Sequence, residues 1–131
     1  MIKLNGISKV VKMRTSEEYR KKLRGMKKNI YIDGELVGRE DPRLIPSTNV
    51  LAKTFDLVED PKFKDLITVK SHLTGEEINR FTHIHQSVED LLKKQELIRK
   101  AACLTGGCIQ RCMGWDSMNA LSVITYVMDQ S

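Results

Sequence analysis

Apolar residues follow a helical spacing over most of the chain, so the pattern predicts a mostly α fold. The segment Thr15-Ser16-Glu17-Glu18 is typical of a helix start, because a hydroxyl side chain precedes two acidic residues in the first turn. The helix is predicted to run to about Arg24 and to stop at Gly25.

One small hairpin interrupts this helical pattern. Two β-prone segments, Ile30–Ile32 and Glu35–Val37, flank the dipeptide Asp33-Gly34. Tight two-residue hairpins favour that dipeptide because both central positions need positive φ. The prolines Pro42 and Pro46 mark the loop that follows.

The middle of the chain is predicted to hold two further helices. Ser47 is expected to cap the first, whose inward face carries Val50, Leu51, Phe55 and Val58. Pro61 is expected to end that helix or to start a short new one, which would run through Phe63 and Leu66.

Two long helices are predicted in the last part of the chain. Ser87 and Asp90 resemble a capping box in which Asp replaces the usual Glu. The helix that they start is expected to bury one apolar stripe, made of Val88, Leu91, Leu92, Ile98 and Ala102. Gly106-Gly107 should end it or bend it sharply, and the last helix should run from about Cys108 through Met128.

The end of the chain, ALSVITYVMDQS, is apolar on nearly every side, which is typical of a helix buried on most sides. That stretch contains no Gly, Asn or Pro stop signal. We therefore expect the front part of a longer protein. Residues 1–14 would be an N-terminal extension, and residues 15–131 one helical domain that is cut within or just after its last helix.

The formal net charge of +5 could favour nucleic acid, an anionic membrane or a phosphate-bearing ligand. However, the basic residues are spread out, and aromatic residues are only 5% of the chain. We therefore expect solvated helix faces, with neither nucleic acid nor a membrane as partner. Three cysteines without a signal peptide favour free thiols or metal ligands in a cytoplasmic protein.

Two of these cysteines, Cys108 and Cys112, stand four residues apart in LTGGCIQRCMGWD. On a helix, such residues share a face with Cβ atoms about 5–6 Å apart, whereas a disulfide needs about 3.8 Å. No disulfide is expected, but a helix start favours thiolates, and both could bind one multi-atom group. By spacing alone, two core cysteines remain the commoner arrangement, because zinc and ferredoxin-like sites favour shorter spacings.

The stripe that begins with these cysteines is more polar than the rest of the predicted helix. A polar stripe on an apolar helix tends to face a site or a partner. It consists of Cys108, Cys112, Trp115, Asn119, Ser122 and Tyr126.

Other candidate residues carry a weaker signal. His83 and His85 could form a metal pair, although two hydrogen-bonded histidines in a loop are the commoner arrangement. Tyr126 and Asp129 could serve proton chemistry, but nothing in the sequence selects them. Gly106-Gly107 lacks both the GxGxxG pattern and the preceding strand of a phosphate-binding loop.

A family resemblance covers nearly all of the chain after about Val11. The run KSHLTGEEINRFTHIHQSVEDLLKKQELIRKAACLTGGCIQRCMGWDSMNALSVITYVMD is similar to the N-terminal domain of the 4-hydroxybutyryl-CoA dehydratase family. Upstream, MRTSEEYRKKL, NIYIDGELV and DPRLIPSTNVLAKTFDLVEDPKFKDLITVKS resemble the same domain in the same order. The wider family includes the two-component 4-hydroxyphenylacetate 3-monooxygenases. The resemblance implies the helical N-terminal domain of the acyl-CoA dehydrogenase-like fold, with one small β-hairpin.

The resemblance also implies a role for the cysteine pair. In the dehydratase family the cysteines that match Cys108 and Cys112 are two ligands of a 4Fe–4S cluster, and a His and a third Cys from a later domain complete it. In the monooxygenases the same positions hold an arginine and a tyrosine that contact the phenolic substrate. Cys103 has no counterpart among the ligands and is expected to be a core thiol.

The implied activity is a radical elimination of water that depends on FAD and the 4Fe–4S cluster. It converts 4-hydroxybutyryl-CoA to crotonyl-CoA, and the family also isomerises vinylacetyl-CoA, in anaerobic fermentation. The flavin-binding strands, the other cluster ligands and the catalytic bases have no positions here. The chain alone should therefore lack catalytic residues and activity. The implied partners are the C-terminal remainder of the enzyme, the CoA thioester and further copies of the protein.

Two alternatives remain open. One is a flavin-dependent 4-hydroxyphenylacetate 3-monooxygenase-like protein without a cluster, against which the cysteine pair argues. The other is a non-catalytic helical interaction module whose apolar last helix is covered by a partner.

Overall fold

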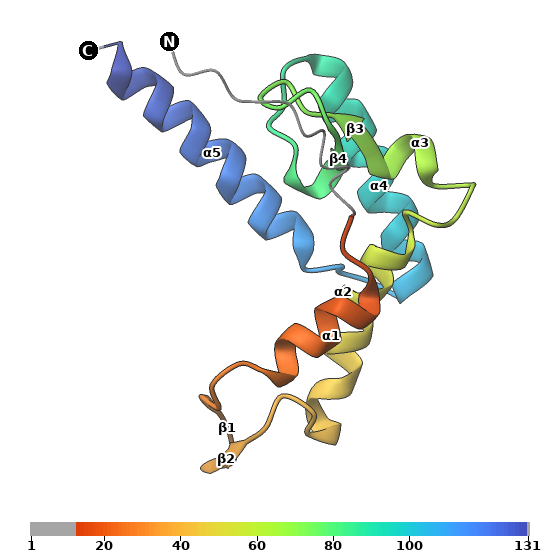
Figure 1. The fold of residues 1–131 in the computed structure, drawn as a ribbon, viewed down its shortest axis with the longest axis vertical. Coiled ribbons are helices and arrows are strands. Elements are labelled where there is room, and N and C mark those ends of the chain that lie inside the picture. Colours follow the sequence, from red (N-terminus) through yellow and green to blue (C-terminus); the bar gives the residue numbers. More distant parts are fainter. Residues whose placement is uncertain (1–12, 131) are drawn as a thin grey trace, which may run out of the picture.

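The computed structural model describes residues 13–130, so the predicted N-terminal extension lies almost entirely outside the described part (Figure 1). The predicted mostly α class is confirmed. The helices are α1 (Ser16–Arg24), α2 (Ile45–Asp56), α3 (Lys64–Ile67), α4 (Val88–Thr105) and α5 (Arg111–Asp129), and two single 3-10 turns are η1 (Pro42–Leu44) and η2 (Arg80–Thr82). The strands are β1 (Ile30–Ile32), β2 (Glu35–Val37), β3 (Thr68–Lys70) and β4 (Glu77–Asn79).

Helix α1 begins at the predicted hydroxyl cap, Thr15, which forms a capping box with Glu18. The Glu18 amide donates to the Thr15 hydroxyl over 3.2 Å, and the Thr15 amide donates to the Glu18 carboxylate over 3.0 Å. These two bonds satisfy amides that the first turn of a helix leaves without a partner. The helix ends at Gly25, as predicted.

The predicted hairpin also forms, and it lies at the end of α1 and α2 that is remote from α5 (Figure 1). Asp33 and Gly34 adopt φ values of 50° and 82°. Positive φ at both central residues is what the tight turn requires.

The prediction of one hairpin is wrong, because β3 and β4 form a second. Thr68 pairs with Asn79 and Lys70 with Glu77. The connecting turn is closed by bonds from the Ser71 amide to the Glu76 carbonyl and from the Gly75 amide to the Ser71 carbonyl, at 2.8 and 2.9 Å. Strands of three residues are too short to show a periodic pattern, and their turn lacks a hairpin dipeptide.

The predicted start of the second helix at Ser47 is also wrong, because α2 begins two residues earlier, at Ile45. The 3-10 turn η1, which the Asp41 carboxylate caps, continues directly into the helix. Pro46 fits the first turn, where its missing amide costs no hydrogen bond.

The core lies where α3, η2, the second half of α4 and the start of α5 meet. Its buried members are Leu57, Phe63, Ile67, Phe81, Leu97, Ala101, Ile109 and Trp115. On α4 the predicted stripe is wrong in its first half, because Val88, Leu91 and Leu92 are exposed. In its second half Ile98 packs against the core and Ala102 is half-buried, beside the fully buried Leu97 and Ala101. The first half of α4 carries no core residue, because only its second half reaches the cluster.

Helix α5 is more exposed than predicted. Trp115 is its one buried residue among those described, and the apolar side chains from Leu121 to Met128 face outward. Figure 1 shows why: the helix leaves the other elements after its first turns and extends away from them. No helix within residues 13–130 combines the length and apolar character that a membrane crossing requires.

Candidate functional site

The turn before α5 determines where the cysteines lie. Gly106 ends α4 with a φ of 74°, and its amide donates to the Ala102 carbonyl. Gln110 precedes α5 with a φ of 59°, a backbone conformation that is uncommon for a residue other than glycine. The last helix therefore begins at Arg111, and the prediction that it begins near Cys108 is wrong.

The two cysteines nevertheless remain neighbours. Cys108 is exposed in the turn, whereas Cys112 lies in the first turn of α5 and packs partly against the core. The Cys108 sulfur accepts the Gln110 amide over 3.4 Å. Burial raises the pKa of the Cys112 thiol, and the neighbouring Cys108 raises it further through charge and a hydrogen bond. The expected preference for thiolate at the helix start is thus outweighed at Cys112.

The third cysteine does not have the expected place. Cys103 is exposed on α4 and is not a core thiol, because the buried face of that helix carries Leu97 and Ala101. Because Cys103 is exposed, its replacement is a suitable control for replacements of Cys108 and Cys112.

The cysteine pair fits part of an iron–sulfur site. Thiolate sulfur is the donor that iron–sulfur clusters use, and the buried Ile109 lies between the two cysteines in the sequence. Within the described residues, no group of three or more His, Cys, Asp or Glu side chains could hold a metal ion. The chain can thus supply two ligands, and further ligands would have to come from outside these residues.

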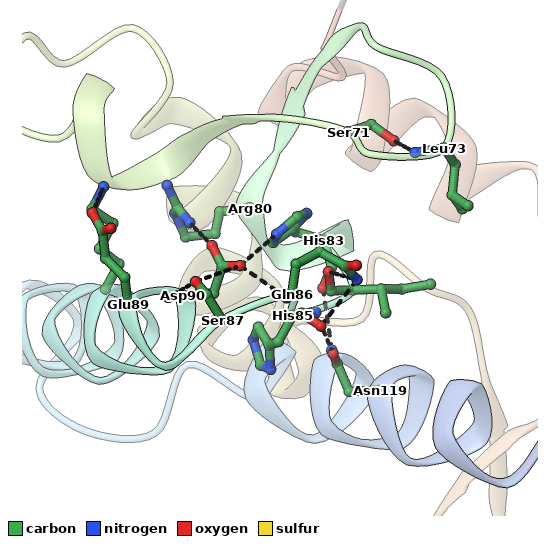
Figure 2. Close-up of polar contacts among 12 residues, drawn as sticks. Ser71, Leu73, Arg80, His83, His85, Gln86, Ser87, Glu89, Asp90 and Asn119 are labelled. Carbon is green, nitrogen blue, oxygen red and sulfur yellow. Dashed lines mark hydrogen bonds and ion pairs between the residues drawn. The ribbon is translucent and has the colours of Figure 1, made fainter. Parts of the chain in front are cut away.

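A second polar cluster surrounds the buried His83, in the loop before α4 (Figure 2). His83 Nε2 lies 3.2 Å from Asp90 Oδ2, and Arg80 Nη1 lies 3.2 Å from Asp90 Oδ1. Burial raises the pKa of Asp90, but bonds from the Gln86 amide and from His83, together with the charge of Arg80, lower it on balance. The carboxylate therefore holds the loop, η2 and α4 together.

Helix α5 is tied to the same loop by two residues of the predicted polar stripe. Trp115 Nε1 donates to the His83 carbonyl over 2.8 Å, and Asn119 Nδ2 donates to the same carbonyl over 3.2 Å. The His85 amide donates to Asn119 Oδ1 over 2.7 Å, and Figure 2 shows Asn119 pointing from the helix toward this loop. These bonds join residues more than 30 positions apart in the sequence.

A cavity of about 680 Å³ lies beside this contact. The far end of the predicted polar stripe lines this cavity, where Asn119, Ser122 and Tyr126 lie together with His85. Two imidazole nitrogens here, His83 Nδ1 and His85 Nε2, are buried without a hydrogen-bond partner. Burial and the charge of Lys94 lower the pKa of His85.

Of the residues with a weaker signal in the sequence, some line the cavity and others do not. The rings of His83 and His85 lie 6.4 Å apart, and no third ligand in residues 13–130 completes a metal site with them. Tyr126 lines the cavity, whereas Asp129, the last residue of α5, does not.

Sequence reasoning missed Arg111, whose guanidinium stacks between Phe55 and Phe81. The signal available was a basic residue at a helix start without an acidic residue in the first turn.

The fold defines a class: the helical N-terminal domain of the acyl-CoA dehydrogenase-like fold. A solved structure of the oxygenase component of 4-hydroxyphenylacetate 3-monooxygenase shares this fold, with a TM-score of 0.58 at 24% identity over 68% of this chain and 19% of that one. The chain belongs to the family that is described as 4-hydroxyphenylacetate 3-hydroxylase N terminal, whose model matches residues 15–131.

Two dehydratases are more similar to the chain. The 4-hydroxybutyryl-CoA dehydratase/vinylacetyl-CoA-Δ-isomerase of Clostridium aminobutyricum is 42% identical over 118 residues, which is 88% of this chain. An oxygen-tolerant archaeal 4-hydroxybutyryl-CoA dehydratase from N. maritimus gives a TM-score of 0.83 at 38% identity over 90% of this chain. The chain spans 24% of the length of each.

Proposed function

We propose that this chain forms the N-terminal part of an enzyme that removes water from 4-hydroxybutyryl-CoA to give crotonyl-CoA and isomerises vinylacetyl-CoA. The observation that carries the proposal is that Cys108, in the turn before α5, lies near enough to Cys112, in its first turn, to raise the pKa of the Cys112 thiol. The identity of 42% between this chain and the Clostridium aminobutyricum dehydratase/isomerase supports the same proposal.

In this proposal Cys108 and Cys112 hold one side of a 4Fe–4S cluster, and FAD binds elsewhere in the longer protein. When bound, the two groups would supply one-electron transfer and a Lewis acid for the leaving hydroxyl. The chain's own part is positional. The buried residues Ile109 and Trp115 hold the turn and the first part of α5 against the core, so the two sulfurs have a fixed place.

The outward apolar face of α5 supports a further part of the proposal. The exposed side chains Leu121, Val123, Ile124 and Val127 would be covered by the remainder of the longer protein or by further copies of it. Neither the partner cysteine and histidine ligands nor the catalytic bases come from the described residues in this proposal.

A chimera tests the proposed function. In it, this chain replaces the corresponding N-terminal quarter of the Clostridium aminobutyricum relative, and the protein is reconstituted anaerobically with iron, sulfide and FAD. We expect conversion of 4-hydroxybutyryl-CoA to crotonyl-CoA. Cys108→Ser or Cys112→Ser should lower the rate at least about a hundredfold, in line with the loss of a metal ligand.

Cys103→Ser is the matched control, because it changes an exposed thiol on α4 and should leave the rate unchanged. A folded chimera that binds FAD but neither dehydrates nor isomerises these CoA esters would contradict the proposal. Hydroxylation of 4-hydroxyphenylacetate by an iron-free preparation would instead favour the monooxygenase alternative.

A further inference from the structure

The side chain of Arg111, the first residue of α5, is fixed in an aromatic slot on α2 and η2. Its Cζ atom lies 4.2 Å from the ring centroid of Phe55 and 4.5 Å from that of Phe81. Nη1 donates to the Thr54 hydroxyl over 3.1 Å, and that hydroxyl donates to the Leu51 carbonyl over 2.6 Å. Three surrounding groups therefore hold the guanidinium in one position.

This positive charge has no carboxylate partner among the described residues. Burial and the charge of Arg14 lower the pKa of Arg111 to about 10, the Tyr19 phenol opposes this shift, and no carboxylate is among its causes. The first turn of α5 holds no acidic residue either, although the start of a helix is its positive end. Residues 1–12 contain no Asp or Glu that could supply the missing charge.

A partly buried cation without a counter-charge costs free energy, which points to a counter-charge from outside the described residues. A guanidinium offers five N–H donors, and among the described residues one hydrogen bond, to Thr54, is formed. The other guanidinium nitrogens of Arg111 are not among the buried polar atoms of the described residues that lack a hydrogen bond.

A cavity of about 450 Å³ adjoins Arg111 and is also lined by the exposed Arg14. Two carboxylates, Glu18 and Glu77, share its lining. Glu18 accepts the Thr15 amide in the capping box, and Glu77 is exposed on β4. Within residues 13–130 neither carboxylate forms an ion pair with Arg111, whose side-chain hydrogen bond goes to Thr54.

We propose that this cavity binds an anionic oxygen group, a carboxylate or a phosphate, which pairs with Arg111 and Arg14. The planar fork of Arg111 suits two parallel hydrogen bonds to either group. The group has two possible sources: an acidic side chain of another protein segment, or a phosphate-bearing small molecule. The inference does not depend on the proposed reaction, because it uses neither the cysteines nor the CoA ester.

The test is a titration of the 131-residue chain with sodium phosphate and, separately, with sodium acetate at constant ionic strength. The ¹H–¹⁵N signals of the arginine Nε–H groups report binding. We expect a saturable shift of the Arg111 signal and a higher melting temperature. Acetate binding as tight as phosphate binding would indicate an acidic side chain as the natural source, whereas phosphate binding tighter by about tenfold would indicate a phosphate-bearing ligand.

Variants locate the site. Arg14→Gln should fold normally, because Arg14 is exposed, and should weaken binding of the preferred anion about tenfold. Arg111→Lys should weaken it at least as much, because lysine lacks the fork. Arg99→Gln, an exposed arginine of α4 outside the cavity, is the control and should change nothing. The absence of a saturable shift with both anions, or an affinity that Arg14→Gln leaves unchanged, would overturn the proposal.

Discussion

At the scale of single residues, two histidines of one loop differ in their surroundings. His83 is buried and has Asp90 beside Nε2, whereas His85 Nε2 is buried without a partner. The cause of the lowered pKa of His85 is first burial and then the positive charge of Lys94. The opposing charges of Asp90 and Asp116 do not reverse this direction.

The lowered pKa of His85 predicts a pH dependence of stability. Below the unfolded-state pKa of about 6.5, the unfolded chain binds a proton on this residue that the folded chain resists. The free energy of unfolding should therefore fall as the pH decreases from about 6.5 toward 5, and His85→Gln should make that slope shallower. Urea denaturation at a series of pH values measures the slope.

The exposed His72 provides the matched control for this prediction. His72→Gln should leave the slope as it is in the unchanged protein. If His85→Gln and the unchanged protein share one slope, the electrostatic interpretation of His85 is wrong.

At the scale of elements, the α4–α5 turn decides the direction of the last helix. Gly106 adopts a φ of 74°, and a Cβ atom there would meet nothing within 4 Å. Any cost of a larger residue is therefore backbone strain alone. The turn is further fixed by the buried Ile109, one residue before Gln110.

Gly106→Ala should accordingly destabilise the protein by about 1 kcal/mol, the usual cost of a left-handed conformation without glycine. Gly25→Ala is the matched control. Gly25 ends α1 with a φ of −77°, and its added Cβ would only touch the Lys22 carbonyl at 3.7 Å. Chemical denaturation of the two variants compares them, and equal losses of stability would contradict the account.

The elements that could be predicted from the sequence are those with strong local signals. Each of these signals lies within four residues of sequence, and each element formed where it was predicted. They are the helix caps at Thr15–Glu18 and Ser87–Asp90 and the hairpin turn at Asp33-Gly34. The start of α5 could not be predicted, because Gln110 adopts positive φ in a turn that tertiary packing holds. The same limit applies to β3 and β4, which are short and pair across a turn without a typical dipeptide.

At the scale of the whole molecule, α5 presents an apolar face that the described residues leave uncovered. Val123, Val127 and Met128 are each at least 60% exposed. Exposed patches of this kind promote association with other protein surfaces.

The 131-residue chain should therefore self-associate through α5. The double variant Val123→Glu/Val127→Glu should shift the mass in sedimentation experiments to that of a monomer, since it places charges on the apolar face. Leu73→Glu is the control, because Leu73 is at least as exposed but lies in the β3–β4 turn. An unchanged monomer in all three proteins would contradict this expectation.

The candidate site could be predicted only in part. The cysteine pair and the polar stripe are visible as residue types at a fixed spacing. The bonds of Trp115 and Asn119 to the His83 loop, and the stacking of Arg111 on Phe55, join segments more than 30 residues apart. Such contacts depend on how the helices pack, which no local pattern encodes.

We propose above all that Cys108 and Cys112 together hold part of a 4Fe–4S cluster. The most direct test of this proposal is the iron content of the reconstituted chimera with the Clostridium aminobutyricum relative. The account predicts about four iron atoms per chain for the unchanged cysteines and for Cys103→Ser, with most of the iron lost in Cys108→Ser and Cys112→Ser. Full iron content in a folded Cys108→Ser/Cys112→Ser double variant would contradict it.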